Sequence, residues 1–274
     1  MVKVVDSMGY KKCLVIFIDI LGSQDRTDYD ELLKINRTFH MQLENNQIQD
    51  KAGTVYRRKI YTFSDCAYII YDYKEGVDEN RKDLGKLMNV AMYNTEMVIN
   101  AFMSNGFICR GGIAYGDVHY EEERSLFFGP AVNRAYQIEN KEAIYPRIVV
   151  DDYVAEEVIE YNNRLLVTNW QNAEMIKQIN GTIVKKDTDG KYIMHYLNRM
   201  QQGHDYLFFK NEQELLNELI QKQINEQDAK LAKDQEDKRA KSIIEKYKWL
   251  KKYLGESAPI EDSGMITCQY EIWG

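Results

Sequence analysis

Residues 13–22 read CLVIFIDILG, a run of six apolar residues that ends abruptly at Asp19. A continuous apolar run of this length is typical of a strand that is buried on both faces. The carboxylate of Asp19 is therefore expected at the end of a buried strand. The turn that follows, from Ile20 to Gly22, offers backbone N–H groups to an anion, and its glycine allows close approach.

A second aspartate lies in a similar setting. Residues 56–72 read as two strands joined at Ser64-Asp65. If the strand of Asp19 is adjacent, the two carboxylates converge on a site for a hard cation such as magnesium, which prefers carboxylates and phosphate oxygens. Each aspartate taken alone is more often a turn former or a helix cap.

Helices and strands alternate irregularly around these two strands. Helical spacing of apolar residues predicts a helix from about 28, another over 84–104 that ends at Asn105-Gly106, and a third after Gly129-Pro130. Strands are expected at 107–115, with a turn at Gly116-Asp117, and at 145–150. The order β-α-β-β-α-β-β-α-β predicts an α+β fold, an antiparallel-rich sheet with helices on one side.

The pattern changes after about residue 165, so the chain is divided into a catalytic domain (1–165) and a C-terminal extension (166–274). Residues 182–194 predict a hairpin whose Asp-Gly forms the turn. Residues 211–250 contain no Gly or Pro and predict one long charged helix. Its polar middle, 226–241, is interpreted as a solvated face, with a coiled segment against a partner chain as the alternative.

Composition excludes several function classes. The net charge of −7 argues against broad nucleic-acid binding. No apolar run approaches the ~20 residues of a membrane span, and the first residues lack the apolar core of a secretory signal. Cys13, Cys66, Cys109 and Cys268 show no paired spacing, so buried free thiols and a reducing cytoplasm are expected.

Five short motifs follow one another in order: FIDILGS (17–23), FSDCAY (63–68), RGGIAYGDVHY (110–120), FFGPAVNRAYQIE (127–139) and AIYPRI (143–148). Together they resemble the catalytic domain of class III nucleotidyl cyclases, a ferredoxin-like β-α-β-β-α-β palm. More narrowly they resemble the pyrimidine cyclases of bacterial Pycsar antiphage systems. The resemblance spans residues 11–152, with weaker support near Trp249.

The resemblance implies a head-to-tail homodimer with composite sites and two Mg²⁺ or Mn²⁺ ions per site. Asp19, Ile20 and Asp65 match the metal-binding positions. Ile20, Leu21 and Gly22 match the turn whose amides hold the β- and γ-phosphates.

Asn133 matches the asparagine that acts at the transition state and comes from the opposite chain. Purine cyclases carry an arginine four residues beyond it, where this chain has Gln137. Arg134 or Arg110 is the expected substitute. Arg57 and Arg58 point to opposite faces of their strand, since successive side chains alternate, so at most one of them points into the site. Arg58 is the candidate phosphate ligand, and a solvent-facing side chain is the alternative.

The positions that read the base depart from the purine pattern. Tyr61 stands where purine cyclases have a lysine, and Phe127 where they have an aspartate. An aromatic wall narrows the pocket and suits a pyrimidine, although either ring is also a candidate for core packing. The expected reaction is UTP to 3′,5′-cyclic UMP and pyrophosphate, with CTP as the alternative substrate and a separate effector that reads the product. The rivals are a purine cyclase and a catalytically inactive nucleotide-binding domain.

Overall fold

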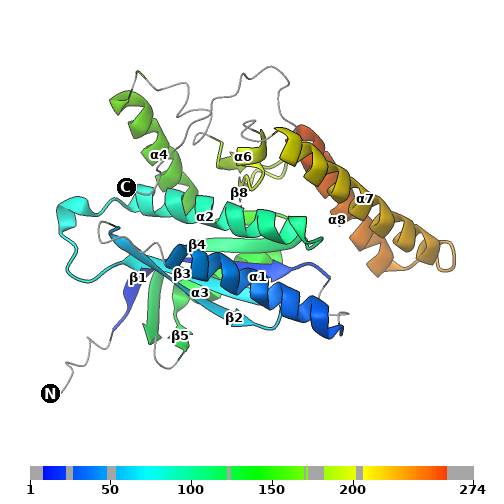
Figure 1. Cartoon of the computed structure of the whole chain (residues 1–274), viewed down its shortest axis with the longest axis horizontal. Helices are drawn as coiled ribbons and strands as arrows, with labels where there is room; N and C mark the ends of the chain where they lie inside the picture. The colour runs from blue at the N-terminus through cyan, green and yellow to red at the C-terminus, as the bar shows by residue number, and fades with distance from the viewer. Residues whose placement is uncertain are drawn as a thin grey trace.

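A computed structural model describes residues 9–22, 27–47, 54–121, 125–169, 171, 182–201 and 206–257 (Figure 1). One sheet runs through the molecule in the strand order β2-β3-β1-β4-β6-β8-β7, with β5 paired to β4. The α+β prediction is confirmed. The strands are β1 (Lys11–Ile20), β2 (Tyr56–Phe63), β3 (Cys66–Tyr73), β4 (Cys109–Glu121), β5 (Leu126–Phe128), β6 (Ile148–Val150), β7 (Val184–Lys186) and β8 (Tyr192–Met194).

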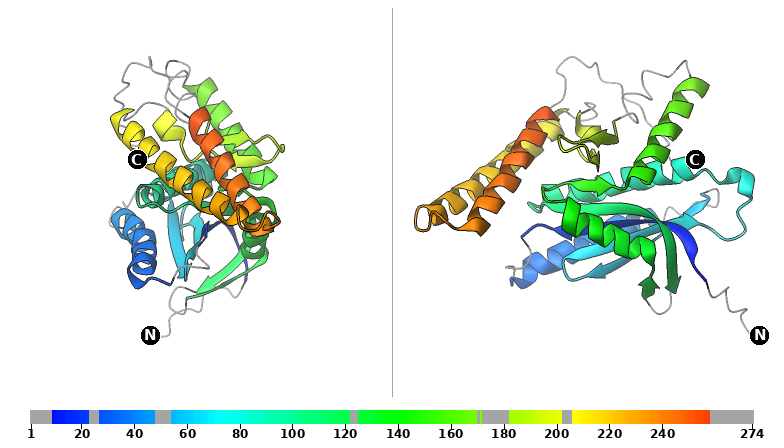
Figure 2. Two further views of the ribbon diagram at one scale, coloured as in Figure 1. Left: turned by 90° about the vertical axis from the view of Figure 1, so that its right-hand side faces the viewer. Right: turned by 180° about the vertical axis from the view of Figure 1, so that it is seen from behind.

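Helices cover both faces of this sheet. They are α1 (Tyr29–Gln47), α2 (Leu84–Ser104), α3 (Pro130–Glu142), α4 (Asp152–Thr168), the short α6 (Asn198–Gln201), α7 (Tyr206–Leu231) and α8 (Lys238–Glu256), with a 3₁₀ turn η2 at Glu79–Arg81. α1 lies in front of the sheet in Figure 1, and α3 lies in front of it in the reversed view of Figure 2. The expectation of helices on one side thus holds for α1, α2 and α4, while α3 packs on the opposite face.

The apolar run at residues 13–20 explains why β1 is central. β1 pairs antiparallel with β3 on one side and with β4 on the other. Successive side chains of a strand point to opposite faces. Leu14, Ile16 and Ile18 therefore join the larger core under α1, α2 and α4, while Val15 and Phe17 join the smaller core under α3.

β4 is longer than expected. The predicted turn at Gly116-Asp117 is wrong, because β4 continues through it and pairs Gly116 with Cys13 and Asp117 with Lys12. The ion pair of Lys12 with Asp117, at 2.9 Å, lies at this end of the strand. A Cβ at Gly116 would lie 3.5 Å from the side chain of Ala131, which is ordinary van der Waals contact, so packing against α3 does not require a glycine at this position.

The C-terminal extension is built on the same sheet. The hairpin predicted at 182–194 is confirmed by β7 and β8, and Gly190 takes a φ of 82° in its turn. β8 pairs with β6, so the hairpin continues the sheet beyond residue 165.

The single long helix predicted for 211–250 is wrong. α7 ends at Leu231, and α8 starts after Asp237, whose carboxylate accepts a hydrogen bond of 2.9 Å from the N–H of Ala240. One continuous helix of this length would span roughly 60 Å and separate its two apolar ends. The reversal brings both ends into one core, where Leu216 and Ile220 join Leu250.

Other expectations concern membranes and thiols. Within the described ranges, no helix combines the length and the apolar character that a bilayer crossing requires. Cys13 and Cys109 are buried free thiols, as predicted, and Cys66 is a free thiol that is partly buried. Cys268 lies outside the described residues.

Candidate active site

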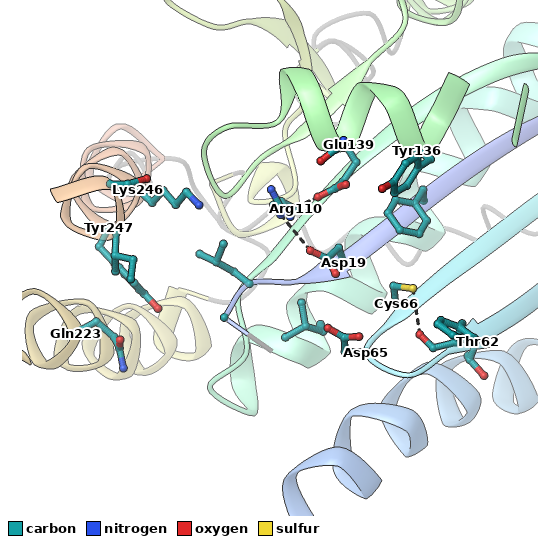
Figure 3. A pocket seen from close by; sticks show the side chains of 18 of the residues that line it. Asp19, Thr62, Asp65, Cys66, Arg110, Tyr136, Glu139, Gln223, Lys246 and Tyr247 are labelled. Atoms are coloured by element: carbon teal, nitrogen blue, oxygen red, sulfur yellow. Dashed lines mark hydrogen bonds and ion pairs between the residues drawn. The ribbon is translucent and has the colours of Figure 1, made fainter. Parts of the chain in front are cut away.

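A cavity of about 1550 Å³ lies where β1 and β3 meet the α7–α8 hairpin. Its floor carries Asp19 and Asp65, and residues of α3 line one side. Figure 3 shows Asp19, Arg110 and Glu139 close together, with Lys246 extending toward them from α8. The predicted acidic site is therefore part of a large pocket.

Strand pairing brings the two aspartates together. Asp19 lies opposite Cys66 in the antiparallel pair of β1 and β3, and the N–H of Ile20 donates to the carbonyl oxygen of Asp65 at 3.2 Å. α1 supports the turn, because the Asn36 side chain donates to the carbonyl oxygen of Ser64 at 3.0 Å. The expectation that these strands are adjacent is confirmed.

Arg110 lies between two carboxylates at the floor of the cavity. It is opposite Asp19 in the register of β1 and β4, and its Nε donates to Asp19 Oδ2 at 3.1 Å. The same Nε forms an ion pair with Glu139 Oε1 at 2.7 Å, but Glu139 Oε1 accepts no hydrogen bond from a described residue. Arg110 thus neutralises part of the negative charge of these two carboxylates, and Glu139 Oε1 can still accept a hydrogen bond.

Burial dominates the electrostatics of these carboxylates. Burial raises the pKa of Asp19, Arg110 opposes the shift, and the charge of Asp65 adds to it. Burial likewise raises the pKa of Glu139 to about 7, against the effect of Arg110. Burial lowers the pKa of Lys246, with a further contribution from Arg110, while Glu139 and Asp19 oppose the shift. The cavity therefore holds charges that water does not fully solvate.

The floor fits a divalent cation. Asp19 and Asp65 are two carboxylates on neighbouring strand ends whose mutual repulsion a cation would relieve. Among the described residues, no three Asp, Glu, His or Cys side chains form a closed metal cluster. Two carboxylates with open positions for substrate oxygens suit magnesium, which keeps few protein ligands. Asp19, Asp65 and the backbone of Ile20 are the groups available to hold it.

The turn after β1 does not offer the amides that were expected. The N–H of Ile20 is donated to Asp65, and the N–H of Leu21 is donated to the carbonyl oxygen of Ile108 at 2.7 Å. Neither is available to a phosphate in this structure. Gly22 lines the cavity and takes a φ of 76°. Of these three residues, it is the one that stays a candidate phosphate ligand.

The two aromatic residues predicted to contact the base form one wall of the cavity. The rings of Tyr61 and Phe127 stack with centroids 4.3 Å apart, and Phe127 also contacts Tyr68 at 5.1 Å. Both rings line the cavity and both pack against the smaller core. Each ring therefore lines the cavity and also packs against the smaller core, so the two alternatives, pocket wall and core packing, do not exclude each other.

Three predicted residues lie outside this cavity. Asn133 is exposed on α3, as expected of a residue that acts on another chain. Arg134 donates to Asp151 and to Glu142, both at 2.8 Å. Arg58 contacts the ring of Tyr71, far along β2 from the turn at Asp65. Of the two arginines considered as substitutes, the structure places Arg110, and not Arg134, in the cavity.

Several lining residues were not predicted from the sequence. Tyr136, Glu139 and Asn140 lie one helical turn apart on α3, and this spacing could have marked a shared face. Lys246 and the rest of the α7–α8 hairpin had no such signal, because their place depends on the reversal at 232–237.

No protein-family model and no curated protein matches this chain. Three solved structures resemble it in fold. The catalytic core of a rhodopsin-guanylyl cyclase with converted specificity in complex with ATPalphaS is 17% identical, and the match covers 54% of this chain and 82% of that one with a TM-score of 0.40.

The monomeric guanylyl cyclase domain of the RhoGC fusion protein from the aquatic fungus Blastocladiella emersonii is 14% identical over 68% of this chain and 95% of that one, with a TM-score of 0.44. A bacterial light-regulated adenylyl cyclase is 14% identical over 55% of this chain and 46% of that one, with a TM-score of 0.39. Likeness at these identities and TM-scores carries no argument, so an argument about function has to come from the site.

Proposed function

We propose that this chain is a nucleotidyl cyclase that converts UTP to 3′,5′-cyclic UMP and pyrophosphate, with CTP as the alternative substrate. One observation carries the proposal: Asp19 and Asp65 lie side by side at the floor of a cavity that also has an aromatic wall. A cation site next to a flat stacking surface is what a nucleoside triphosphate requires. The motifs quoted above point to the same class of enzyme.

The residues of the cavity have different roles in the proposed reaction. Asp19 and Asp65 hold Mg²⁺ or Mn²⁺, which supplies charge neutralisation and activation of the ribose hydroxyl. Arg110 lies beside Asp19 and adds positive charge near the reacting phosphate. The ribose 3′-oxygen bonds to the α-phosphorus, the bond to the bridging oxygen breaks, and pyrophosphate leaves with release of the hydroxyl proton. Alignment and charge stabilisation account for the rate, with no covalent intermediate.

The stack of Tyr61 on Phe127 supports a pyrimidine. Its ring centroids are 4.3 Å apart, so no base inserts between the two rings and a base would stack on the face of the wall toward the cavity. Neither ring offers the charged group that would pair with a purine edge. A single ring stacked on the cavity side of this wall is the better fit.

Asn133 supports a homodimer with composite sites. It is exposed on α3 and does not line the cavity of its own chain, which is the placement a residue needs if it acts in the site of a second copy. In the cell we place the enzyme in the cytoplasm, where its product would act as an antiphage signal read by a separate effector.

The rival proposal is an inactive nucleotide-binding domain. Gln137 in place of an arginine and the engaged amides of Ile20 and Leu21 favour it.

A turnover assay distinguishes the cyclase from the inactive domain. Purified full-length chain is incubated with ATP, GTP, CTP and UTP separately in Mn²⁺, and products are identified by mass spectrometry. Cyclic UMP or cyclic CMP supports the proposal, a cyclic purine contradicts the argument from Tyr61 and Phe127, and triphosphate binding without any product supports the inactive domain.

The carboxylate pair and the dimer are tested together. Asp65→Asn should reduce turnover by roughly a thousandfold or more, since a metal ligand is lost while the shape of the side chain is kept. Asn133→Ala should also impair turnover. Mixing the two variants should restore part of the activity, because one composite site of the heterodimer keeps both residues. Proven heterodimers without any rescue would contradict the shared site. Asp78→Asn, at an exposed residue outside the cavity, serves as the charge-matched control.

A further inference from the structure

The α7–α8 hairpin turns a polar stripe toward the cavity. Gln223, Gln227 and Lys230 lie on one face of α7 at i, i+4 and i+7 and line the cavity. On α8, Ser242 and Lys246 line the same cavity one turn apart. Leu216 and Leu250 point into the core, while Ala240, Ile243 and Tyr247 of α8 line the cavity beside these polar residues. The hairpin therefore forms a polar roof over an acidic floor.

Lys246 is the most deeply placed cation of this roof. Its amine is close enough to the floor for the charges of Arg110, Glu139 and Asp19 to affect it. Within the described part of the chain, it forms no ion pair or hydrogen bond. A half-buried ammonium group without a fixed partner, facing an open cavity, is available to an anionic ligand.

A buried amide points to the same use. Gln227 is only 4% exposed, and its Oε1 accepts no hydrogen bond from a described residue. Leaving a buried polar atom without a partner costs free energy, so such atoms usually have a ligand or water. The buried amide oxygen of Gln227 thus offers an acceptor that a ligand or water in the cavity can use.

The core holds Lys246 in place from one turn farther along α8. The indole N–H of Trp249 donates to Asp187 Oδ2 at 3.2 Å, and its ring stacks on Tyr145 with centroids 5.8 Å apart. Asp187 is in turn bound by Arg147 at the base of β7 and β8. The position of the ammonium group therefore follows from a rigid contact between α8 and the sheet.

We propose that the α7–α8 hairpin binds the polyphosphate chain of the substrate in the same protomer, with Lys246 as its principal ligand and Lys230 as a second, more exposed one. This inference rests on the proposed function, and it assigns to the hairpin the phosphate contacts that the engaged amides of Ile20 and Leu21 do not provide. Asp19 and Asp65 then bind the cation, and Lys246 and Lys230 bind the phosphates, of one triphosphate; Glu226 and Asp237 also line the hairpin side of the cavity, so the phosphate contacts are assigned to these two lysines and not to the roof as a whole.

Inorganic tripolyphosphate is the probe. Calorimetric titration of the full chain in Mg²⁺ at fixed ionic strength should show affinity roughly tenfold weaker in Lys246→Gln, because one charge-assisted hydrogen bond is lost. Lys246→Arg should keep most of the affinity. Lys248→Gln, a neighbour on α8 that lies outside the cavity, should bind like the wild type.

A second variant protects the test against misfolding. Lys230 is exposed, so Lys230→Gln should fold normally and bind tripolyphosphate about threefold more weakly, as expected for a solvent-screened charge. Unchanged affinity in both Lys230→Gln and a folded Lys246→Gln would overturn the proposal, as would a wild type that binds no tripolyphosphate.

The proposed function and the hairpin proposal fail in different ways. If no cyclic product forms but Lys246→Gln still loses tripolyphosphate affinity, the function is wrong and the hairpin proposal stands. If product forms while Lys246→Gln keeps the KM of the wild type for the triphosphate, the function stands and the hairpin proposal is overturned. The expected result is a KM raised about tenfold in Lys246→Gln and unchanged in Lys248→Gln.

Discussion

Arg110 and Arg147 each lie between two carboxylates, yet their surroundings differ. Arg147 is 1% exposed and donates to Asp187, to Asp189 and to the carbonyl oxygen of Glu142. The side chain of Arg110 is 24% exposed, lines the cavity, and makes one hydrogen bond, to Asp19.

The difference separates a structural arginine from one available to a ligand. The fork of Arg147 is closed on both sides by carboxylates of the β7–β8 turn, so it fastens this hairpin to the sheet. Arg110 shares its charge between Asp19 and Glu139 and faces open space, so a bound phosphate can still use it. Residue type and neighbouring charges alone do not distinguish these roles; solvent access and hydrogen-bond saturation do.

Replacing Arg147 should have the largest effect on stability. Arg147→Met removes the cation and leaves Asp187 without its buried partner, so we expect the free energy of unfolding to fall by about 3–5 kcal/mol. Urea unfolding followed by circular dichroism measures it. A loss below about 1 kcal/mol would show that the Arg147 network is replaceable, and Arg164→Met, at an exposed ion pair with Asp83, is the matched control.

Replacing Arg110 should affect activity more than stability. Arg110→Gln is expected to lower kcat/KM by roughly tenfold to a hundredfold, since a positive charge next to the reacting phosphate is lost. The free energy of unfolding should change by only about 1 kcal/mol, because Glu139, whose pKa is already raised to about 7, takes up a proton when its cation is removed. Stopped assays and urea unfolding, carried out on the same preparation, compare the change in kcat/KM with the change in the free energy of unfolding. A large loss of stability with unchanged kcat/KM would show that Arg110, like Arg147, is a structural arginine.

The smallest effect is expected at Trp249, which links the two regions. Trp249→Phe keeps an aromatic ring beside Tyr145 but removes the N–H bond to Asp187, so the free energy of unfolding should fall by about 1 kcal/mol. The KM for the triphosphate should rise slightly, because Lys246 lies one turn away on α8. Thermal unfolding and initial rates test this. An unchanged KM together with reduced stability would show that the position of Lys246 does not depend on this anchor.

Much of the sheet could be predicted from local pattern. The apolar run at 13–18 and the strand pair around Ser64-Asp65 were predicted correctly because short runs rich in β-branched and aromatic residues, bounded by turn residues, favour strands. The turn at Gly116-Asp117 was mispredicted, since glycine in a strand looks the same in one dimension as glycine in a turn. The long helix failed for a related reason: helical periodicity does not record where the chain reverses when the turn contains neither Gly nor Pro.

The candidate site was predicted less completely. Asp19 and Asp65 were named from their places at strand ends, and Arg110 was one of two arginines considered as a substitute at position 137; pairing of β1 with β3 and β4 brought the three together. Arg58 was misplaced because alternation predicts a face of the strand but not the distance along it. The amides of Ile20 and Leu21 looked available because only tertiary contacts show that the carbonyl oxygens of Asp65 and Ile108 accept from them.

By itself the sequence determined which strands are buried, where the two aspartates lie along them, and that positions 61 and 127 carry aromatic rings. These properties depend on residue type and on periodicities of two and 3.6 residues, which are local. The tertiary structure alone decided that the α7–α8 hairpin folds back over Asp19 and Asp65 and places Lys246 opposite their carboxylates. That arrangement depends on burial of apolar ends that are distant in sequence, and no local pattern encodes which distant surfaces will share one core.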